Sequence, residues 1–165
     1  MKRGVFALES CIFHALAHPK RVEIVHLLSE KQLSVQEIVS MVGISQANVS
    51  QHLMLLRRLG LVRSHIQKQQ RIYELSSPSV SKLSTAVRHI LLERTGLHEE
   101  THLNALHIHQ DPVCKMQISA QMAASSSVYE GKRYYFCASG CEKRFKKNPA
   151  FYSEKEAVSA VTSTI

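Results

Sequence analysis

Two short helices joined by a three-residue bridge are the feature that most restricts how this chain can fold. Ser34 is a helix-capping residue and Glu37, three positions later, completes a capping box, so a helix is predicted over Val35–Val42. Gly43 can end that helix, and Ser45 can cap the next one. Two helices connected by so short a bridge form a helix-turn-helix.

The segments on either side of this pair complete a winged helix-turn-helix. Apolar residues recur at helical spacing ahead of the pair, and Pro19 divides them into two helices, because proline fits the first turn of a new helix. The second capped helix is predicted to end at Leu59, and Leu61–Ile66 and Arg71–Leu75 are predicted strands around a polar turn. Pro78 begins an amphipathic helix whose apolar side carries Val80, Leu83, Val87, Ile90 and Leu91. The predicted fold class is mainly α with a β-hairpin wing.

Positive charge is concentrated in the first part of the chain. Residues 1–96 hold 13 lysines and arginines against six acidic residues, whereas residues 97–165 hold eight against seven. A basic part joined to a nearly neutral part suggests that the first meets a polyanion and the second does another job.

The second helix of the pair has a polar face that suits the major groove of double-stranded DNA. Val49, Leu53 and Leu56 point one way at about 100° per residue, which leaves the opposite face free. Amide side chains can read adenine edges there, and hydroxyls can serve several bases. The predicted base contacts are Ser45, Gln46, Asn48, Ser50 and Gln51. The predicted phosphate contacts are Arg57, Arg58, Arg63, Lys68 and Arg71.

The first part of the chain also resembles a known family. His18-Pro19-Lys20-Arg21, and the stretch from Ser45 to Gly60-Leu61-Val62, are similar to the winged-helix domain of the ArsR/SmtB family of bacterial repressors. The likeness covers residues 10–95. It implies a homodimer held by the first and last helices, an operator with an inverted repeat, and release of the DNA when an inducer binds.

The family's metal-sensing positions have changed in this chain. Ser34 and Gln36 stand where the arsenic-sensing branch has two cysteines. The ligand positions of the zinc-sensing branch are occupied by Ser77, Ser79, Ile90 and Glu93. Hydroxyls, an amide and an isoleucine cannot replace thiolate or imidazole donors, so the sensor is expected elsewhere or is absent.

A histidine-rich stretch separates the two parts. Four histidines (His98, His102, His107 and His109) fall within 12 residues that lack a sustained apolar stripe. We therefore predict a winged-helix domain for DNA binding and dimerisation at 1–96, a linker at 97–110, a cysteine metal-binding domain at 111–152 and a tail at 153–165.

Three cysteines beyond the linker form a candidate metal site. Cys137 and Cys141 lie four residues apart at a turn entering a helix, where their sulfurs can converge and the helix amino terminus is expected to lower the thiol pKa. Cys114 would be a third ligand from a distant loop. Three soft donors suit Cu(I), Ag(I) or a similar thiophilic ion, with Met116 as a candidate fourth donor. Zn(II) remains an alternative if a histidine completes a tetrahedron.

This second part resembles the YHS domain, a small treble-clef-like α+β module. The likeness runs from Asp111-Pro112-Val113-Cys114 through Tyr134-Tyr135-Phe136-Cys137 to Tyr152. Tyr135 and Ala138 occupy the places of the histidine and serine that give the domain its name. A segment of this size usually needs a structural metal or a disulfide to be stable, so a bound ion would supply folding free energy.

These observations predict a DNA-binding regulator, a repressor that leaves its operator when a soft metal ion binds the three cysteines. The alternative is a thiol redox or persulfide switch that uses the same cysteines. No base and orienting carboxylate can be assigned around a cysteine, so an enzyme is not expected. The fourth cysteine, Cys11, is predicted to pack in the first helix. No window approaches the roughly 18 apolar residues of a membrane span, and we expect a cytoplasmic protein.

Overall fold

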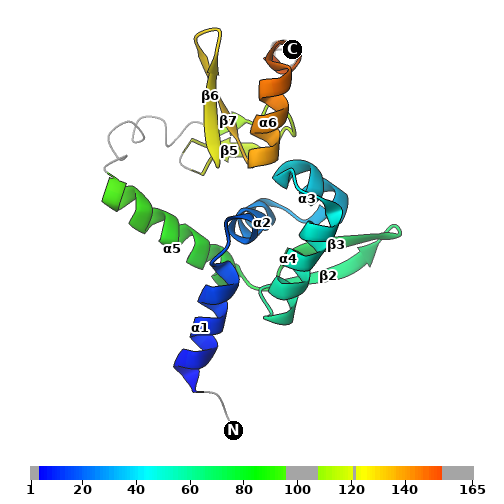
Figure 1. The fold of residues 1–165 in the computed structure, drawn as a ribbon, viewed down its shortest axis with the longest axis vertical. Coiled ribbons are helices and arrows are strands. Elements are labelled where there is room, and N and C mark those ends of the chain that lie inside the picture. Colours follow the sequence, from blue (N-terminus) through cyan, green and yellow to red (C-terminus); the bar gives the residue numbers. More distant parts are fainter. Residues whose placement is uncertain (1–3, 96–107, 121, 154–165) are drawn as a thin grey trace, which may run out of the picture. The chain divides into compact units, whose positions relative to one another are not determined.

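The computed structural model describes residues 4–95, 108–120 and 122–153 and divides the chain into two compact units, Met1–Arg94 and Thr95–Ile165. The first unit (Figure 1) is a winged helix-turn-helix, as the sequence predicts. Its helices are α1 (Val5–Leu16), α2 (Pro19–Glu30), α3 (Val35–Val42), α4 (Gln46–Arg58) and α5 (Pro78–Thr95). Its antiparallel sheet has the order β1-β3-β2, formed by β1 (Leu33–Ser34), β2 (Val62–Gln67) and β3 (Gln70–Leu75).

The predicted helix boundaries are confirmed by their caps. The Ser34 hydroxyl accepts from the backbone N–H of Glu37, and the Glu37 carboxylate accepts from the backbone N–H of Ser34, which completes the capping box. Gly43 ends α3 in the left-handed region at φ 70°, and Ser45 caps α4 by accepting from the N–H of Asn48. Each such cap stabilises its helix by about 1 kcal/mol and sets where the helix begins, whereas most of the stability of the pair comes from packing.

The core of the first unit lies where α2, α3 and α4 meet. Val49, Leu53 and Leu56 of α4 are buried, as their spacing predicts. They pack with fully buried side chains of the neighbouring helices, among them Ile24, Leu27 and Ile38. Burying one side of α4 leaves the opposite side exposed.

The wing is a tight hairpin rather than the strands with a four-residue turn that the sequence predicts. Gln67 and Gln70 pair with each other in the β2–β3 ladder, so the turn consists of Lys68 and Gln69 alone. Both residues have positive φ, 45° and 65°, the conformation of a two-residue turn that follows the twist of the strands. The sequence predicts a longer turn because Gln67 and Gln70, which form the last pair of the ladder, are polar like the turn residues.

The apolar stripe predicted on α5 is mostly exposed. Val80 is buried, whereas Val87, Ile90 and Leu91 are 46%, 55% and 56% exposed. A shallow apolar groove of about 180 Å³ adjoins this stripe, between α1, α2 and α5. In the part of the chain described, α5 therefore turns an apolar surface toward solvent.

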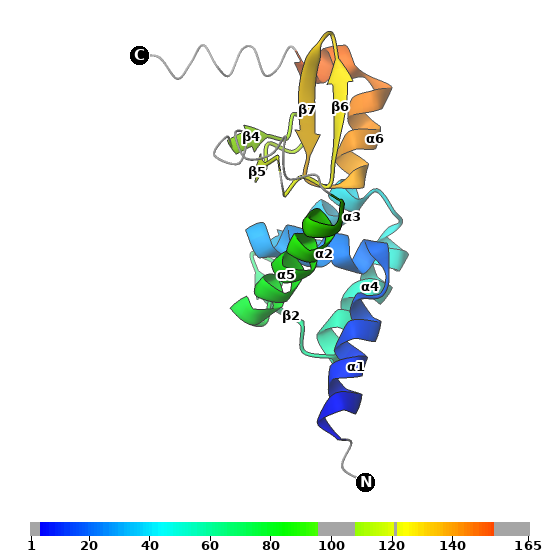
Figure 2. The same ribbon diagram turned by 90° about the vertical axis from the view of Figure 1, so that its left-hand side faces the viewer.

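The second unit is a small α+β module. Its elements are β4 (Ile108–Gln110), β5 (Gln117–Ser119), β6 (Ser125–Tyr129), β7 (Lys132–Phe136) and α6 (Ser139–Lys147). β4 pairs with β5 and β6 with β7, both antiparallel, and α6 packs against the β6–β7 hairpin (Figure 2). Phe145 of α6 is buried with Tyr134 and Phe136 of β7, at ring-centroid distances of 4.8 and 5.2 Å.

Two local predictions for this unit are wrong. Ile108–Gln110, which the sequence assigns to the linker, forms β4, because a strand of three residues is too short to show a period. Ser125–Ser127, read as a turn, begins β6, because pairing with β7 outweighs the low strand propensity of serine. The linker histidines before His109 lie outside the described residues. No described helix is long and apolar enough to cross a membrane.

Candidate functional site

The polar face of α4 is accessible over its whole length. Every residue predicted to contact bases is exposed, at the cap of α4 or on its first two turns: Ser45, Gln46, Asn48, Ser50 and Gln51. Arg58 is exposed at the end of the same helix, and Lys68 is exposed at the tip of the hairpin. The surface therefore has the shape of a helix followed by a projecting basic hairpin.

Two arginines predicted to contact phosphate occupy different electrostatic settings on the hairpin. Arg71 of β3 is exposed. Arg63 of β2 donates through Nε to a carboxylate oxygen of Glu74 at 2.9 Å, and Gln32 donates to the other oxygen at 2.6 Å. Because Glu74 offsets its charge, Arg63 attracts a polyanion less strongly than an arginine without an acidic neighbour would.

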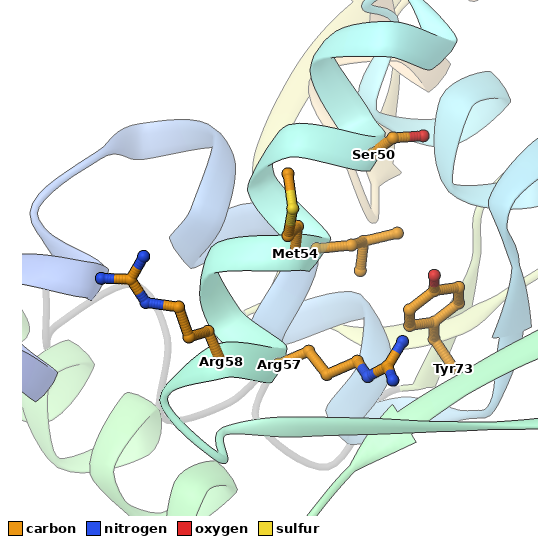
Figure 3. Close-up of a pocket in the computed structure, with 6 residues that line it drawn as sticks. Ser50, Met54, Arg57, Arg58 and Tyr73 are labelled. Carbon is orange, nitrogen blue, oxygen red and sulfur yellow. The ribbon is translucent and has the colours of Figure 1, made fainter.

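A hollow of about 570 Å³ lies between α4 and β3, and its lining includes Tyr73. In Figure 3 the Ser50 hydroxyl and the Arg57 guanidinium extend to the side of α4 where Tyr73 lies, whereas Arg58 extends to the other side. Sequence reasoning did not select Tyr73, because a single tyrosine within a predicted strand has no local signature of a DNA contact. Its ring is buried, but its hydroxyl is at the hollow.

The three cysteines of the second unit are close together. The Cys114 and Cys137 sulfurs are 3.3 Å apart, and the Cys137 and Cys141 sulfurs are 3.8 Å apart. Cys114 lies in the turn between β4 and β5, Cys137 directly follows β7, and Cys141 is in the first turn of α6. These sulfur distances exceed the 2.05 Å or so of a disulfide, and none of the three cysteines forms one.

A buried carboxylate organises this cluster. One oxygen of Asp111 accepts from the backbone N–H groups of Val113 and Cys114 at 2.9 and 3.3 Å. Its other oxygen accepts from the backbone N–H of Cys137 at 2.8 Å. Asp111 is fully buried, and it joins the turn that carries Cys114 to the end of the strand that carries Cys137.

Sequence reasoning did not select Asp111 as a site residue. The available signal was an aspartate directly before proline, a pattern typical of a turn in which the side chain accepts from backbone N–H groups further on. The bond to Cys137, 26 residues away, has no local signature. Among the described residues, Asp111, Cys114, Cys137 and Cys141 form a group whose candidate ligand atoms all lie within 4.8 Å of one another.

The electrostatics of the cluster favour neutral thiols. The pKa of Cys137 is raised, first by hydrogen bonding with Cys114 and Cys141 and then by burial. Hydrogen bonding with Cys114 and burial also raise the pKa of Cys141. The expectation that the start of α6 would lower the thiol pKa is therefore wrong, because hydrogen bonding among the thiols and then burial raise the pKa of Cys137 and Cys141. A bound cation would reverse this balance by displacing the thiol protons.

The donor set suits a soft cation. Three sulfurs converge, and the oxygens of Asp111 already accept three backbone hydrogen bonds, which disfavours a fourth, hard ligand. The Arg144 guanidinium lies 3.9 Å from the Cys141 sulfur and can offset negative charge on a thiolate. Met116 is buried, and its role as a fourth donor stays a prediction. Tyr135, at the place of the family histidine, packs against His109 with ring centroids 4.2 Å apart.

Comparisons with known proteins match both halves of the chain. Residues 18–64 match the family model described as "bacterial regulatory protein, arsR family", and residues 109–156 match the YHS domain. The HTH-type transcriptional regulator Rv0081 of Mycobacterium tuberculosis is 36% identical over 88 residues, which span 53% of this chain and 77% of that protein. Its crystal structure superposes with a TM-score of 0.54 at 33% identity and covers 58% of this chain and 96% of that one.

Two further relatives are a transcriptional activator and a metal transporter. The transcriptional activator HlyU of Vibrio cholerae is 39% identical over 72 residues, 44% of this chain and 67% of that protein. A silver exporting P-type ATPase of Salmonella typhimurium is 38% identical over 80 residues, which make up 46% of this chain but only 10% of the transporter.

Replacing Asp111 with asparagine should weaken ion binding at the cysteines without removing a thiol. The amide keeps one acceptor oxygen for Val113 and Cys114 but presents a donor to the N–H of Cys137, so the two cysteine segments lose their link. We expect Ag(I) affinity, measured by competition with a chromophoric chelator, to fall by about 10- to 100-fold. Glu130→Gln, an exposed change of the same charge in the β6–β7 turn, is the control. Unchanged affinity in Asp111→Asn would contradict this role.

Proposed function

Because this chain belongs to the ArsR family of bacterial regulatory proteins and also carries a YHS domain, we propose that it is a metal-responsive repressor. As a transcriptional regulator it binds DNA through the winged helix. In the proposed mechanism, residues 1–96 bind an inverted-repeat operator as a dimer, residues 108–152 bind a soft ion, and ion binding releases the DNA.

The observation that carries the sensing role is the convergence of three sulfurs in the second unit. Cys114, Cys137 and Cys141 come from a turn, a strand end and a helix, and two of them are fully buried. The first unit offers no equivalent at the family's arsenic-sensing positions, because Ser34 is used in the capping box of α3. Sensing is therefore assigned to the second unit.

Several features favour Cu(I) or Ag(I) as the ion. Thiolates are soft donors, and monovalent soft ions accept low coordination numbers that Zn(II) does not favour. The oxygens of Asp111 are already engaged by backbone N–H groups, which disfavours a tetrahedral Zn(II) site of three sulfurs and one carboxylate. Similarity to a silver exporting P-type ATPase points in the same direction, although the transporter's activity is not carried over.

One specific distance favours a second candidate function, a thiol redox or persulfide switch. The Cys114 and Cys137 sulfurs are 3.3 Å apart, close enough to form a disulfide after a small movement. Cys114 is less buried than its two neighbours and is the sulfur that an oxidant, or a polysulfide that transfers a sulfane sulfur, would reach first.

The exposed apolar side of α5 supports dimerisation with a second copy of this chain. Val87, Ile90 and Leu91 lie on that side, and Phe6 and Phe13 of α1 are also exposed. Contiguous apolar surface of this kind is rare on a protein that functions alone. A symmetric pair of winged helices would present two copies of α4 to the two halves of an inverted repeat.

Replacing the cysteines with serine one at a time should separate the two candidate functions. If one ion is held by all three sulfurs, each of Cys114→Ser, Cys137→Ser and Cys141→Ser removes most Ag(I) affinity, because a hydroxyl is a poor donor for a soft ion. Operator release by Ag(I) or Cu(I), assayed anaerobically with all thiols reduced, should be lost in every variant. Cys11→Ser is the matched control and should keep both the Ag(I) affinity and the release of the operator by the ion. Release only by an oxidant or a polysulfide, with one of the three cysteines dispensable, would favour the redox switch.

Two substitutions should separate recognition of the base sequence from sequence-independent affinity for DNA. Gln51→Ala on the exposed face of α4 should flatten base preference across a set of operator variants. Lys68→Ala at the hairpin tip should weaken binding to all sequences about equally and lower the salt dependence. Binding to each duplex is measured by fluorescence anisotropy at several salt concentrations. If Gln51→Ala keeps the original base preference, the recognition face is placed wrongly.

A chain that ends at Gly96 should still form a dimer and bind the operator but should not respond to metal. The crystal structure of Rv0081, 96% of which is matched by 58% of this chain, indicates that a domain of this extent folds by itself. Sedimentation should give the mass of two chains. Val87→Lys in the truncated chain places a charge on the exposed apolar side of α5 and should lower the measured mass to that of one chain. Full metal-dependent release by the truncated chain would return the sensor to the first unit.

A further inference from the structure

The hollow between α4 and β3 has a lining that fits an anion. Figure 3 shows the Ser50 hydroxyl, the Arg57 guanidinium and the Tyr73 hydroxyl at the same side of α4. The described residues that line it are Ser50, Leu53, Met54, Arg57, Arg58 and Tyr73, and none of these is acidic. Positive charge and two hydroxyl donors therefore face an open space, and no carboxylate of the described residues lines it.

We propose that this hollow is a binding site for one phosphate of the DNA backbone, held by Arg57, Tyr73 and Ser50. The proposal rests on the DNA binding put forward above and names a contact that fixes how α4 lies in the groove. Arg57 supplies the charge, and the two hydroxyls donate hydrogen bonds that orient the phosphate oxygens.

The position on α4 supports a backbone contact rather than a base contact. Ser50, which the sequence predicts as a base contact, and Arg57 are seven residues apart, close to two helical turns, so both lie on one flank of the helix. Gln51 and Arg58 are each one residue further on, and a step of about 100° carries them to the face opposite the core. When Gln51 and Arg58 face the major groove of the DNA, Ser50 and Arg57 therefore face the hairpin.

The dimensions of DNA place a phosphate strand along that flank. A helix with its side chains is about 10–12 Å wide and fills a major groove about 12 Å wide, so a sugar-phosphate backbone runs along each side of it. On the flank of α4 that carries Ser50 and Arg57 lies β3 of the hairpin, whose turn holds Lys68. A DNA backbone on that flank would therefore pass through the space between α4 and β3, which is the hollow.

Nearby charges make Arg57 the stronger candidate than Arg63. The Arg63 side chain is held in an ion pair with Glu74, whereas the hollow has no acidic residue in its lining. A phosphate at Arg63 would compete with a carboxylate already bound there. A phosphate at Arg57 would meet a guanidinium and hydroxyl donors arranged around open space.

The first measurement is the salt dependence of DNA binding by the full-length, reduced protein. The duplex is selected from a random-sequence pool by the unaltered protein. Arg57→Gln should lower the slope of log K against log salt by about one, because one phosphate contact is lost. Tyr73→Phe keeps the ring that packs in the core and removes only the hydroxyl, so it should weaken binding by up to about tenfold without changing the slope.

The decisive measurement replaces single phosphates of the duplex with neutral methylphosphonates. The unaltered protein should lose affinity when one particular phosphate of each half-site is replaced. Arg57→Gln should lose nothing further at that phosphate, because its partner is already absent. Lys68→Gln, the control, binds more weakly overall but should remain sensitive at that phosphate, because Lys68 lies in the hairpin turn and is not among the residues that line the hollow.

The outcomes separate this site from the proposed function. If Arg57→Gln keeps the same sensitivity at every phosphate while the unaltered protein binds the duplex, the phosphate site is overturned and DNA binding stands. If the unaltered protein selects no duplex at all, DNA binding and the phosphate site fall together. Thermal unfolding of each variant confirms that a loss of affinity comes from a folded protein.

Discussion

Burial of one side of α4 is the constraint on which the DNA-binding unit depends. Val49 and Leu56 are completely buried and Leu53 nearly so, each stabilising the unit by about 1.5–3 kcal/mol relative to an exposed position. Because a helix is rigid and repeats every 3.6 residues or so, this burial also orients every other side chain of α4. Gln51 faces outward and Arg57 lies beside the hairpin for the same reason.

The second unit depends on a polar interaction instead. Its strands are three to five residues long and α6 has nine residues, so among the described residues little apolar surface is available beyond the cluster around Phe145. Asp111 ties the turn before β5 to the end of β7 through backbone hydrogen bonds. A buried carboxylate is stable only when such donors surround it, and the same donors keep the two cysteine segments together.

The sites differ in how far the residues alone could predict them. The exposed face of α4 follows from one helix, and the predicted residues from Ser45 to Gln51 are exposed there. The convergence of the cysteines was expected from Cys137 and Cys141, whose spacing is local, whereas the part of Asp111 was missed because its bond to Cys137 joins distant segments. The direction of the thiol pKa shift was wrong because a helix terminus can be read from sequence but burial among other thiols cannot.

The sequence by itself determined the helix boundaries, the presence of a hairpin and the three sulfur donors, since caps such as Ser34 and Ser45 act within a few residues of the chain. Only the tertiary structure decided the two-residue turn at Lys68, the ion pair that occupies Arg63, the hollow at Arg57 and the carboxylate clamp of Asp111. The turn depends on the register in which β2 and β3 pair, and the other three features arise where segments separated in sequence come within hydrogen-bonding or van der Waals distance. The physical reason is that local propensities act along the chain, whereas charge pairing, burial and cavity shape depend on which segments become neighbours in the folded protein.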